Sequence, residues 1–433
     1  MRDRSNAKTA VLLIVFLIAG AFAGHFLIDH RLAGTISITT FPAGANIYLD
    51  GEFLGTTPIS IESVQRGFRD LLITKEGYDP WTRLVNIEPR EHWSLHLVLA
   101  DQRIRPQWMH RLTVSLFSPM ILAKDRLYLS SVADGLFALD RHSGEIVWRF
   151  NPGRMSFTAP LIGEESIYLL AFDGTISAVD RSNGRLIWTA KLGVSIASGQ
   201  RALLRNGMIY VLTDDGTVLH RIDAASRTKR PVERLNAVDH LRVRVQAVAL
   251  GKVADVLYLL QPTGRILLVD RFDGRFIAAK SLPLLPLAIT ASDHFIYILA
   301  EMERDSYRLL ALNTNDLSLA WERRIAERPT TIVTVGERIA VGTMAGTMQM
   351  LNTADGKEYW IYQTGEEITN LVITGDDVYA GTADGSIFAV DSISGAIRWR
   401  ADIHSAVITL IPALEGLYVA TRDGTICLLY RPE

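Results

Sequence analysis

A pattern that recurs about every 40 residues over most of the chain limits the fold more than any other feature. The first copy runs through Leu127–Ser130, Asp134-Gly135, Leu136–Asp140, Gly144 and Trp148. Close copies follow at Ile167–Trp188 and Val378–Trp399. Short apolar runs separated by Asp-Gly pairs are typical of β-strands joined by hairpin turns. The chain is therefore expected to stack many small β units, each of which buries its apolar faces against its neighbours.

The length of the repeat predicts a β-propeller over residues 104–433. A period of about 40 residues accommodates four short strands and their turns, which make one propeller blade. The third strand can be recognised at eight places, namely Leu136, Ile176, Val218, Ile266, Leu309, Met348, Ile387 and Ile426. The sequence thus predicts eight blades, with the tryptophans on the outermost strands, where a large side chain covers the adjacent blade.

Each end of this region lacks part of a blade. The last copy ends at Leu428-Leu429-Tyr430 without a fourth strand, whereas Trp108 marks a fourth strand that no other three precede. If these two strands pair, the ring closes and no sheet edge stays open. We therefore expect the strand around Trp108 to pair with the strand Ile426–Leu429.

The motif Leu-Asp-x-x-x-Gly-x-x-x-Trp resembles the repeat of the PQQ-like, quinoprotein-type β-propellers. The resemblance is strong in blades one, two, seven and eight. It is degraded in blades three to five, where Arg227, Ile277 and Pro262-Thr263-Gly264 replace the tryptophan or the Asp-Gly turn. It implies the fold but not one activity, because the family contains quinone-dependent dehydrogenases as well as non-catalytic scaffolds.

The residues favour a scaffold over an enzyme. Quinoprotein dehydrogenases hold a quinone and a calcium ion with carboxylates, and many place a disulfide of adjacent cysteines against the quinone. This chain has one cysteine, Cys427, in an apolar run typical of a buried strand. Its aspartates recur at turn positions of the repeats. His92 and His96 flank Ser94 on one face of a strand, too far apart to chelate one ion easily. We expect no catalytic residue, no cofactor and no metal.

Residues 34–99 predict a separate small β-domain with glycine and proline turns. Thr35–Thr39 and Asn46–Leu49 have the pattern of strands, and Asp50-Gly51 is a hairpin signal. The order of turn residues resembles the PEGA domain, a small β-sandwich found on bacterial and archaeal envelope proteins. The family motif is matched by Pro42-x-Gly44-Ala45, Tyr48-x-Asp50-Gly51, Gly55-x-Thr57-Pro58, Gly67 and Gly77-Tyr78. The resemblance implies a spacer or adhesion module.

The N-terminus predicts attachment to a membrane. Arg2, Arg4 and Lys8, in a cytoplasmic tail of residues 1–8, precede an uncharged apolar run at residues 9–28, long enough to span a bilayer as a helix. The basic flank favours a cytoplasmic N-terminus, which would place the C-terminal domains in the periplasm or outside the cell. A cleaved signal peptide is the alternative, since Ala21-Phe22-Ala23 has small residues at the right spacing. Both interpretations export the rest of the chain.

The formal net charge of −2 gives no electrostatic argument for nucleic acid as a partner. One irregular basic stretch could contact an acidic partner, a lipid headgroup or a glycan, although a solvated insertion explains it as well. Its candidate contact residues are Arg227, Lys229, Arg230 and Arg234.

Together these features predict an all-β protein: a small β-sandwich and an eight-bladed propeller, preceded by one N-terminal transmembrane helix. We expect a non-enzymatic scaffold of the bacterial cell envelope that is anchored in the inner membrane through residues 9–28 and binds envelope proteins through a propeller face. The alternatives are a surface protein that binds cell-wall polysaccharide and, least favoured, a PQQ-dependent dehydrogenase.

Overall fold

The computed structural model describes residues 34–88, 91–116, 118–132, 134–153, 159–193, 202–205, 207–212, 219–223, 229–231, 249–253, 256–260, 264–270 and 276–430. Every regular element among them is a β-strand, and together they form two compact units, Met1–Arg103 and Ile104–Glu433. Within these ranges no helix is long and apolar enough to cross a bilayer. The apolar run at residues 9–28 and the expected third-strand residue Val218 lie outside the described residues.

The first unit is a sandwich of two sheets. One sheet has the order β4-β1-β7, with β4 (Ile59–Val64), β1 (Gly34–Phe41) and β7 (His92–Val98). The other has the order β3-β2-β5-β6, with β3 (Glu52–Thr56), β2 (Asn46–Leu49), β5 (Gly67–Thr74) and β6 (Trp81–Ile87). Alternate residues of both sheets, such as Ile36, Ile47 and Leu71, are fully buried in one shared core. Asp50 and Gly51 form the predicted hairpin turn with φ of 51° and 83°, a conformation that glycine adopts without strain.

The described residues of the second unit form eight four-stranded antiparallel sheets, which we call blades 1 to 8 in chain order. Blade 1 contains β9 (Ile121–Ala123), β10 (Arg126–Ser131), β11 (Gly135–Asp140) and β12 (Ile146–Phe150), and blade 2 contains β13 (Leu161–Ile162), β14 (Ser166–Leu170), β15 (Thr175–Asp180) and β16 (Leu186–Lys191). Blade 3 contains β17 (Ala202–Arg205), β18 (Met208–Leu212), β19 (Leu219–Asp223) and β20 (Lys229–Pro231), and blade 4 contains β21 (Ala249–Val253), β22 (Val256–Leu260), β23 (Arg265–Asp270) and β24 (Phe276–Ser281). Blade 5 contains β25 (Leu285–Ala291), β26 (Phe295–Glu303), β27 (Ser306–Asn313) and β28 (Leu319–Ile325), and blade 6 contains β29 (Pro329–Val335), β30 (Arg338–Thr343), β31 (Thr347–Asn352) and β32 (Glu358–Gln363). Blade 7 contains β33 (Ile368–Ile373), β34 (Asp377–Thr382), β35 (Ser386–Asp391) and β36 (Ile397–Asp402), and blade 8 contains β37 (Val407–Ala413), β38 (Gly416–Thr421), β39 (Thr425–Leu429) and β8 (Pro106–Arg111).

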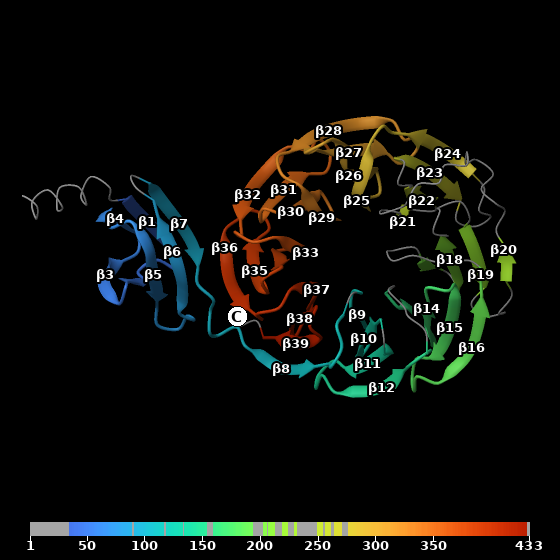
Figure 1. Ribbon diagram of the computed structural model, residues 1–433. Coiled ribbons are helices and arrows are strands. Elements are labelled where there is room, and N and C mark those ends of the chain that lie inside the picture. Colours follow the sequence, from blue (N-terminus) through green and yellow to red (C-terminus); the bar gives the residue numbers. More distant parts are fainter. Residues whose placement is uncertain are drawn as a thin grey trace, which may run out of the picture. The chain divides into compact units, whose positions relative to one another are not determined.

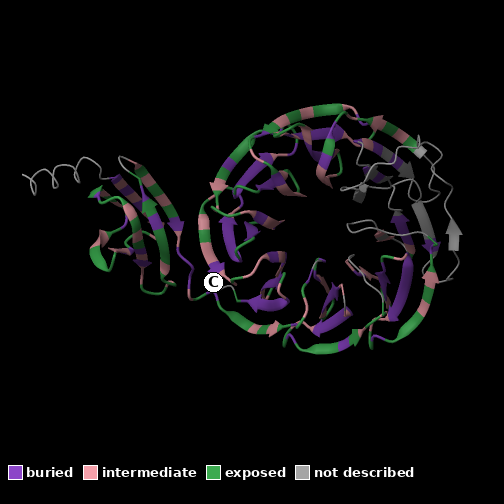
Figure 2. Ribbon diagram, viewed as in Figure 1, coloured by how far each residue is buried: buried purple, intermediate pink, exposed green. Residues whose placement is uncertain are grey.

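The blades are arranged in a ring, with the first strand of each blade innermost and the fourth outermost (Figure 1). The second and third strands are almost entirely buried, whereas exposed and half-buried residues alternate on the outer strands (Figure 2). This pattern arises because the middle strands are covered by neighbouring blades on both faces, and the outer strand keeps one face in solvent. Cys427 lies in the middle strand β39 and is fully buried, which raises the pKa of its thiol to about 12.

Blade 8 is completed by a strand from the other end of the unit, as expected. β8 pairs antiparallel with β39, with Trp108 opposite Leu428 and Met109 opposite Cys427. The Leu112 N–H, directly after β8, donates a further hydrogen bond of 2.9 Å to the Gly424 carbonyl. The predicted closure of the ring by the strand around Trp108 is therefore confirmed.

In blades 1, 2 and 7 an aspartate and a glycine build the turn between the third and fourth strands. In blade 7 the Asp391 carboxylate accepts hydrogen bonds from the N–H groups of Ile393 and Ser394 at 3.1 and 2.8 Å. Gly395 then adopts a φ of 73°. Hydrogen bonds from Ser394 are the main cause of a lowered pKa of about 2 at Asp391. Asp140 and Asp180 accept equivalent bonds in blades 1 and 2. These repeat aspartates therefore have a structural role.

In blades 1, 5, 6 and 8 a tryptophan joins the blade to the next one. The Trp148 indole N–H of blade 1 donates to the Arg181 carbonyl of blade 2 at 3.2 Å, and a Cβ on Gly184 would lie 2.5 Å from the ring. The same contact recurs for Trp108 with Gly144, Trp321 with Gly356 and Trp360 with Gly395. The glycine is needed both for its positive φ and for the close approach of the indole.

The sequence assignment of the residue that replaces this tryptophan in blade 4 is wrong. Ile277 was expected to replace the tryptophan of blade 4, but Ala278 is the residue opposite Leu268, as Trp148 is opposite Ala138. Ile277 is instead 42 % exposed. In blade 5, Leu317 takes the place of the turn glycine, with a φ of 58° and 1 % exposure. A small residue on the strand and a large one in the turn thus fill the space that tryptophan and glycine fill elsewhere.

Candidate functional site: the groove face of the ring

The two faces of the ring carry different loops. Consecutive strands run in opposite directions, so the loops between first and second strands and between third and fourth strands lie on the same face. We call this the groove face, because hollows lie on it between successive blades. The loops between second and third strands, and those between blades, lie on the opposite face.

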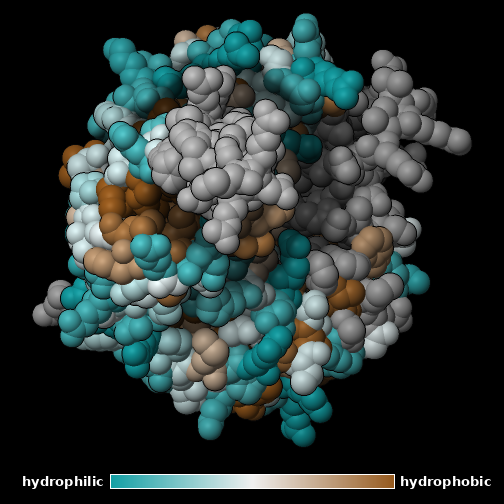
Figure 3. Space-filling model, turned by 60° about the vertical axis from the view of Figure 1, so that its left-hand side comes forward, coloured by the Kyte–Doolittle hydropathy of each residue, from teal (hydrophilic) through white to brown (hydrophobic). Residues whose placement is uncertain are grey.

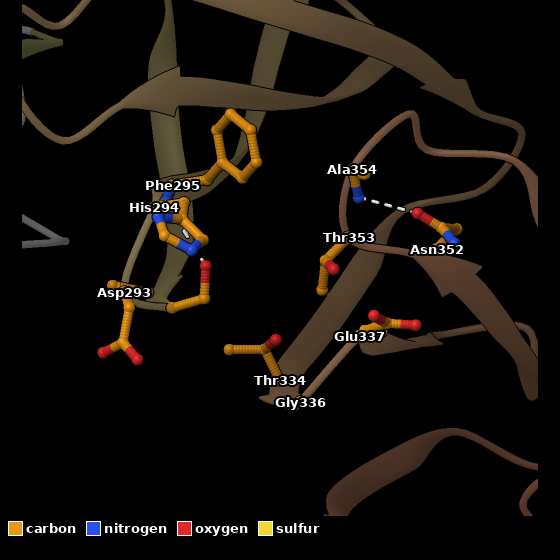
Figure 4. Close-up of a pocket in the computed structure, with 11 residues that line it drawn as sticks. Asp293, His294, Phe295, Thr334, Gly336, Glu337, Asn352, Thr353 and Ala354 are labelled. Carbon is orange, nitrogen blue, oxygen red and sulfur yellow. Dashed lines mark hydrogen bonds between the residues drawn. The ribbon is translucent and has the colours of Figure 1, made fainter.

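The groove between blades 5 and 6 has a volume of about 580 Å³ and a polar lining. Its lining residues come from the loops after β25 and β29 and from the start of the turn after β31 (Figure 4). Asp293, His294 and Glu337 supply the charged and titratable groups, and Asn352 accepts a 2.7 Å hydrogen bond from the Ala354 N–H. The groove between blades 6 and 7 is smaller, at about 370 Å³. Such open polar hollows can accept side chains or loops of another molecule.

The groove between blades 7 and 8 has a volume of about 600 Å³ and is more aromatic. Tyr379, Trp399 and Tyr430 line it together with Leu414. Its neighbour Glu415 forms an ion pair with Arg141 of blade 1, whose Nε donates at 2.7 Å. Burial and a hydrogen bond to Glu415 raise the pKa of Tyr418 to about 12, so the Tyr418 hydroxyl remains a donor to that carboxylate. This network fixes the loop that carries Leu414.

Exposed apolar side chains line the groove between blades 6 and 7 and the groove between blades 7 and 8. Val335 is 46 % exposed, Ile393 70 %, Leu414 107 % and Tyr430 47 %, and all four lie on the groove face of blades 6 to 8. Each belongs to the lining of one of the two grooves. The side of the molecule drawn in Figure 3, a different view, shows separate hydrophobic patches among hydrophilic residues. Exposed apolar residues beside grooves with polar rims are typical of protein interaction sites.

Sequence reasoning did not find these residues, although alignment of the repeats contains a signal. Leu414 occupies the loop position held by Lys124 in blade 1 and Glu164 in blade 2. Ile393 stands in an aspartate turn where blades 1 and 2 have His142 and Ser182, whereas the blade 4 sequence has the apolar Phe272. A large apolar residue is not required for folding of either turn, because other repeats have polar or small residues there.

The residues singled out in the sequence lie elsewhere. Arg227 and Arg234 are outside the described residues, and Lys229 and Arg230 lie in β20, of which only the backbone is described. The contact site expected at these four residues therefore stays a prediction. His92 and His96 are exposed on β7, as expected. Among the described residues there is no cluster of three or more His, Cys, Asp or Glu that could hold a metal ion.

Comparison with known proteins identifies two families in the chain. The family model of the PEGA domain matches residues 33–103. The family model described as outer membrane protein assembly factor BamB matches residues 98–205, 174–288 and 287–428. No curated protein matches the chain.

Solved structures with the same fold include BamB from Moraxella catarrhalis, with 18 % identity and a TM-score of 0.61. They also include the computationally designed protein Ika8, with 15 % identity and a TM-score of 0.63, and Sqt1 from Saccharomyces cerevisiae, with 11 % identity and a TM-score of 0.63. Each similarity covers 76 % of this chain and 100 % of the other. Identities this low establish the fold alone.

Proposed function

Because the chain belongs to the family of the outer membrane protein assembly factor BamB, we propose that it is a non-enzymatic scaffold of the bacterial cell envelope. In this proposal it is an eight-bladed propeller, held on the outer side of the inner membrane by residues 9–28, with the PEGA domain as a spacer. Its ligand is another envelope protein, which binds the groove face over blades 6 to 8.

The observation that carries this proposal is the row of exposed apolar residues on blades 6 to 8. Ile393 and Leu414 are rigidly placed, because their turns are fixed by Asp391 and by the Glu415–Arg141 ion pair. Preorganised apolar side chains beside a groove lower the entropy that is lost on binding. By contrast, the repeat aspartates that might suggest chemistry accept hydrogen bonds within their own turns.

Membrane attachment gives the first test of the proposal. A reporter enzyme that is active only outside the cytoplasm, fused after Glu433, is expected to be active in cells, since the basic flank of residues 9–28 stays inside. The fusion should sediment with membranes and be released by detergent but not by high salt. Activity of a cytoplasmic reporter alone would contradict the orientation. N-terminal sequencing that begins at Gly24 would instead show a cleaved signal peptide.

A quinone-dependent dehydrogenase is the catalytic alternative. We expect the purified chain neither to bind quinone stoichiometrically in the presence of calcium nor to reduce dyes with alcohols or sugars. The reason is that the one cysteine, Cys427, is buried in β39 and the repeat aspartates already have partners. Quinone binding by equilibrium dialysis, followed by dye reduction, measures both properties. One bound quinone per chain together with turnover would reject the scaffold proposal.

Polysaccharide binding is supported by fewer observations. Exposed aromatic rings favour it, and Tyr359 and Tyr430 are both about half exposed. However, they belong to the linings of different grooves, whereas Val335, Ile393 and Leu414 are aliphatic. The aliphatic residues fit a protein surface better than a sugar ring, which aromatic platforms bind.

A further inference from the structure

The two outward faces of the first unit differ in composition. The outer face of sheet β4-β1-β7 carries hydroxyl and imidazole groups, namely Ser37, Thr39, Ser60, His92, Ser94 and His96. Several of them bond one another, such as the Ser37 and Ser60 hydroxyls at 3.1 Å. The hydrogen-bonding groups of this face find partners in one another or in water, so the face is stable when it is exposed to solvent.

The outer face of sheet β3-β2-β5-β6 carries exposed apolar side chains interleaved with the polar residues Asp70, Thr82 and Asn86. Phe53 is 54 % exposed, Phe68 69 % and Leu84 64 %. Tyr48 lies opposite both Phe53 and Leu72, and its ring centroid is 5.4 Å from that of Phe53. We call these five residues the apolar sheet face.

The register makes these residues one continuous surface. Leu84 is opposite Asp70, so it lies diagonally between Phe68 and Leu72 on the neighbouring strand. The residues that alternate with them along the strands, including Ile47, Leu71 and Ile73, are fully buried on the inner side. The unit is therefore a sandwich with one polar outer surface and one on which a group of apolar side chains is exposed.

The length of the connection to residues 9–28 indicates what covers the apolar sheet face. Only five residues, 29–33, separate that apolar run from Gly34 at the start of β1. Fully extended, they reach at most about 18 Å, less than the width of a small domain. If residues 9–28 span the bilayer, this unit is held against the membrane surface.

The apolar sheet face lies close to this point of attachment. A Cβ on Gly34 would lie 2.6 Å from Ile87, and Ile87 is the β6 partner of Gly67, the residue before Phe68. Phe68 and Leu84 are thus near Gly34, where the connection to residues 9–28 begins, rather than at the far end of the unit. Arg66, exposed in the turn before β5, adds a positive charge beside Phe68. Aromatic and basic residues are enriched where proteins meet lipid headgroups.

We propose that the apolar sheet face of the PEGA domain lies in the headgroup layer of the membrane that anchors the chain. This rests on the proposed membrane anchor. The bound surface is shallow, because Asp70 stands among the apolar residues with its carboxylate bonded to Thr82, and a charge is not carried into the hydrocarbon core. The polar outer face of the other sheet points away from the bilayer.

The test uses the full chain reconstituted in phosphatidylethanolamine and phosphatidylglycerol vesicles. Cys427 is buried with a thiol pKa of about 12, so a cysteine introduced on the surface is the one that a maleimide dye labels. Phe68→Cys and Leu84→Cys report on the apolar sheet face, and Ser94→Cys is the matched control on the polar face. An environment-sensitive dye is attached, and nitroxide lipids are then added as quenchers.

At positions 68 and 84 we expect blue-shifted dye emission, and about a twofold loss of fluorescence intensity when nitroxide lipid is added, because interfacial side chains lie at headgroup depth. At position 94 the dye should remain in water and be quenched by iodide. A second variant, Phe53→Asp with the dye at position 84, should return that dye toward aqueous emission.

Three results would overturn the inference, and they are distinguishable. Aqueous emission at 68 and 84, while the chain stays in the vesicles, rejects the contact but leaves the anchor. Blue-shifted emission that nitroxide lipid does not quench shows that a protein surface covers the face. Loss of the chain from the vesicles rejects the anchor of the proposed function, and with it the contact.

Discussion

Deleting residues 104–112 is expected to destabilise the whole ring rather than one blade. The deletion removes β8, which is the outer strand of blade 8 and supplies Trp108 to the contact with Gly144 of blade 1. Five pairs of residues with β39 are lost, and buried Leu112 and Ile104 are lost with them. At about 1 kcal/mol for each hydrogen bond and 1.5–3 kcal/mol for each buried apolar side chain, we expect a loss of 5 kcal/mol or more. Such a loss approaches the whole stability of a typical domain.

Thermal unfolding of the full chain and the reactivity of Cys427 measure this effect. Cys427 lies opposite Met109 in the intact ladder, so opening of blade 8 should let a thiol reagent reach it in the folded temperature range. Deletion of residues 34–99 is the control, since that unit is compact by itself and has its own core. It should leave the melting transition of the ring and the protection of Cys427 unchanged. An unaltered transition after removal of residues 104–112 would disprove closure by β8.

Replacing Trp148 with alanine should lower the free energy of unfolding by about 3–5 kcal/mol, as large-to-small changes of buried tryptophan do. Trp148 is 9 % exposed, packs against Gly184 of the next blade and donates to the Arg181 carbonyl. Val147, its neighbour on β12, is 46 % exposed, so Val147→Ala is a matched control that should change stability by about 0.5 kcal/mol or less. Denaturant unfolding of the three proteins is the measurement.

The glycine side of this contact can be tested separately. Gly184 and Gly193 both have positive φ, at 72° and 78°, but a Cβ on Gly193 meets nothing within 4 Å. Gly184→Ala should therefore be the more destabilising by about 1–3 kcal/mol, the typical cost of overpacking. Equal effects of the two substitutions would mean that backbone strain alone, and not the indole, requires glycine at position 184.

The sequence predicts those features that depend on local periodicity. The turn aspartates, the outer position of Trp148 and the pairing of the strand around Trp108 with Ile426–Leu429 follow from strand alternation and from counting strands. The exchange of tryptophan and glycine for Ala278 and Leu317 does not follow, because the two residues are 39 positions apart in separate repeats, and only the packing between blades relates them.

The candidate site was less predictable than the fold. Sequence reasoning chose the basic residues from Arg227 to Arg234 because charge is conspicuous in a sequence. Ile393 and Leu414 were missed because the sequence does not say that an apolar turn residue is exposed, and exposure depends on how the blades stack. The apolar outer face of the PEGA domain was missed for a similar reason: Phe68 and Leu84 become neighbours only through the pairing of β5 with β6.

Photo-crosslinking in living cells tests most directly whether the groove face binds an envelope protein. A crosslinking amino acid is placed at Leu414 or Ile393, and for comparison at Met344, which is 48 % exposed on the opposite face of blade 6. The account predicts one discrete adduct with the same exported protein from positions 414 and 393, and none from 344. Equal adducts from both faces, or adducts with cytoplasmic proteins only, would contradict it.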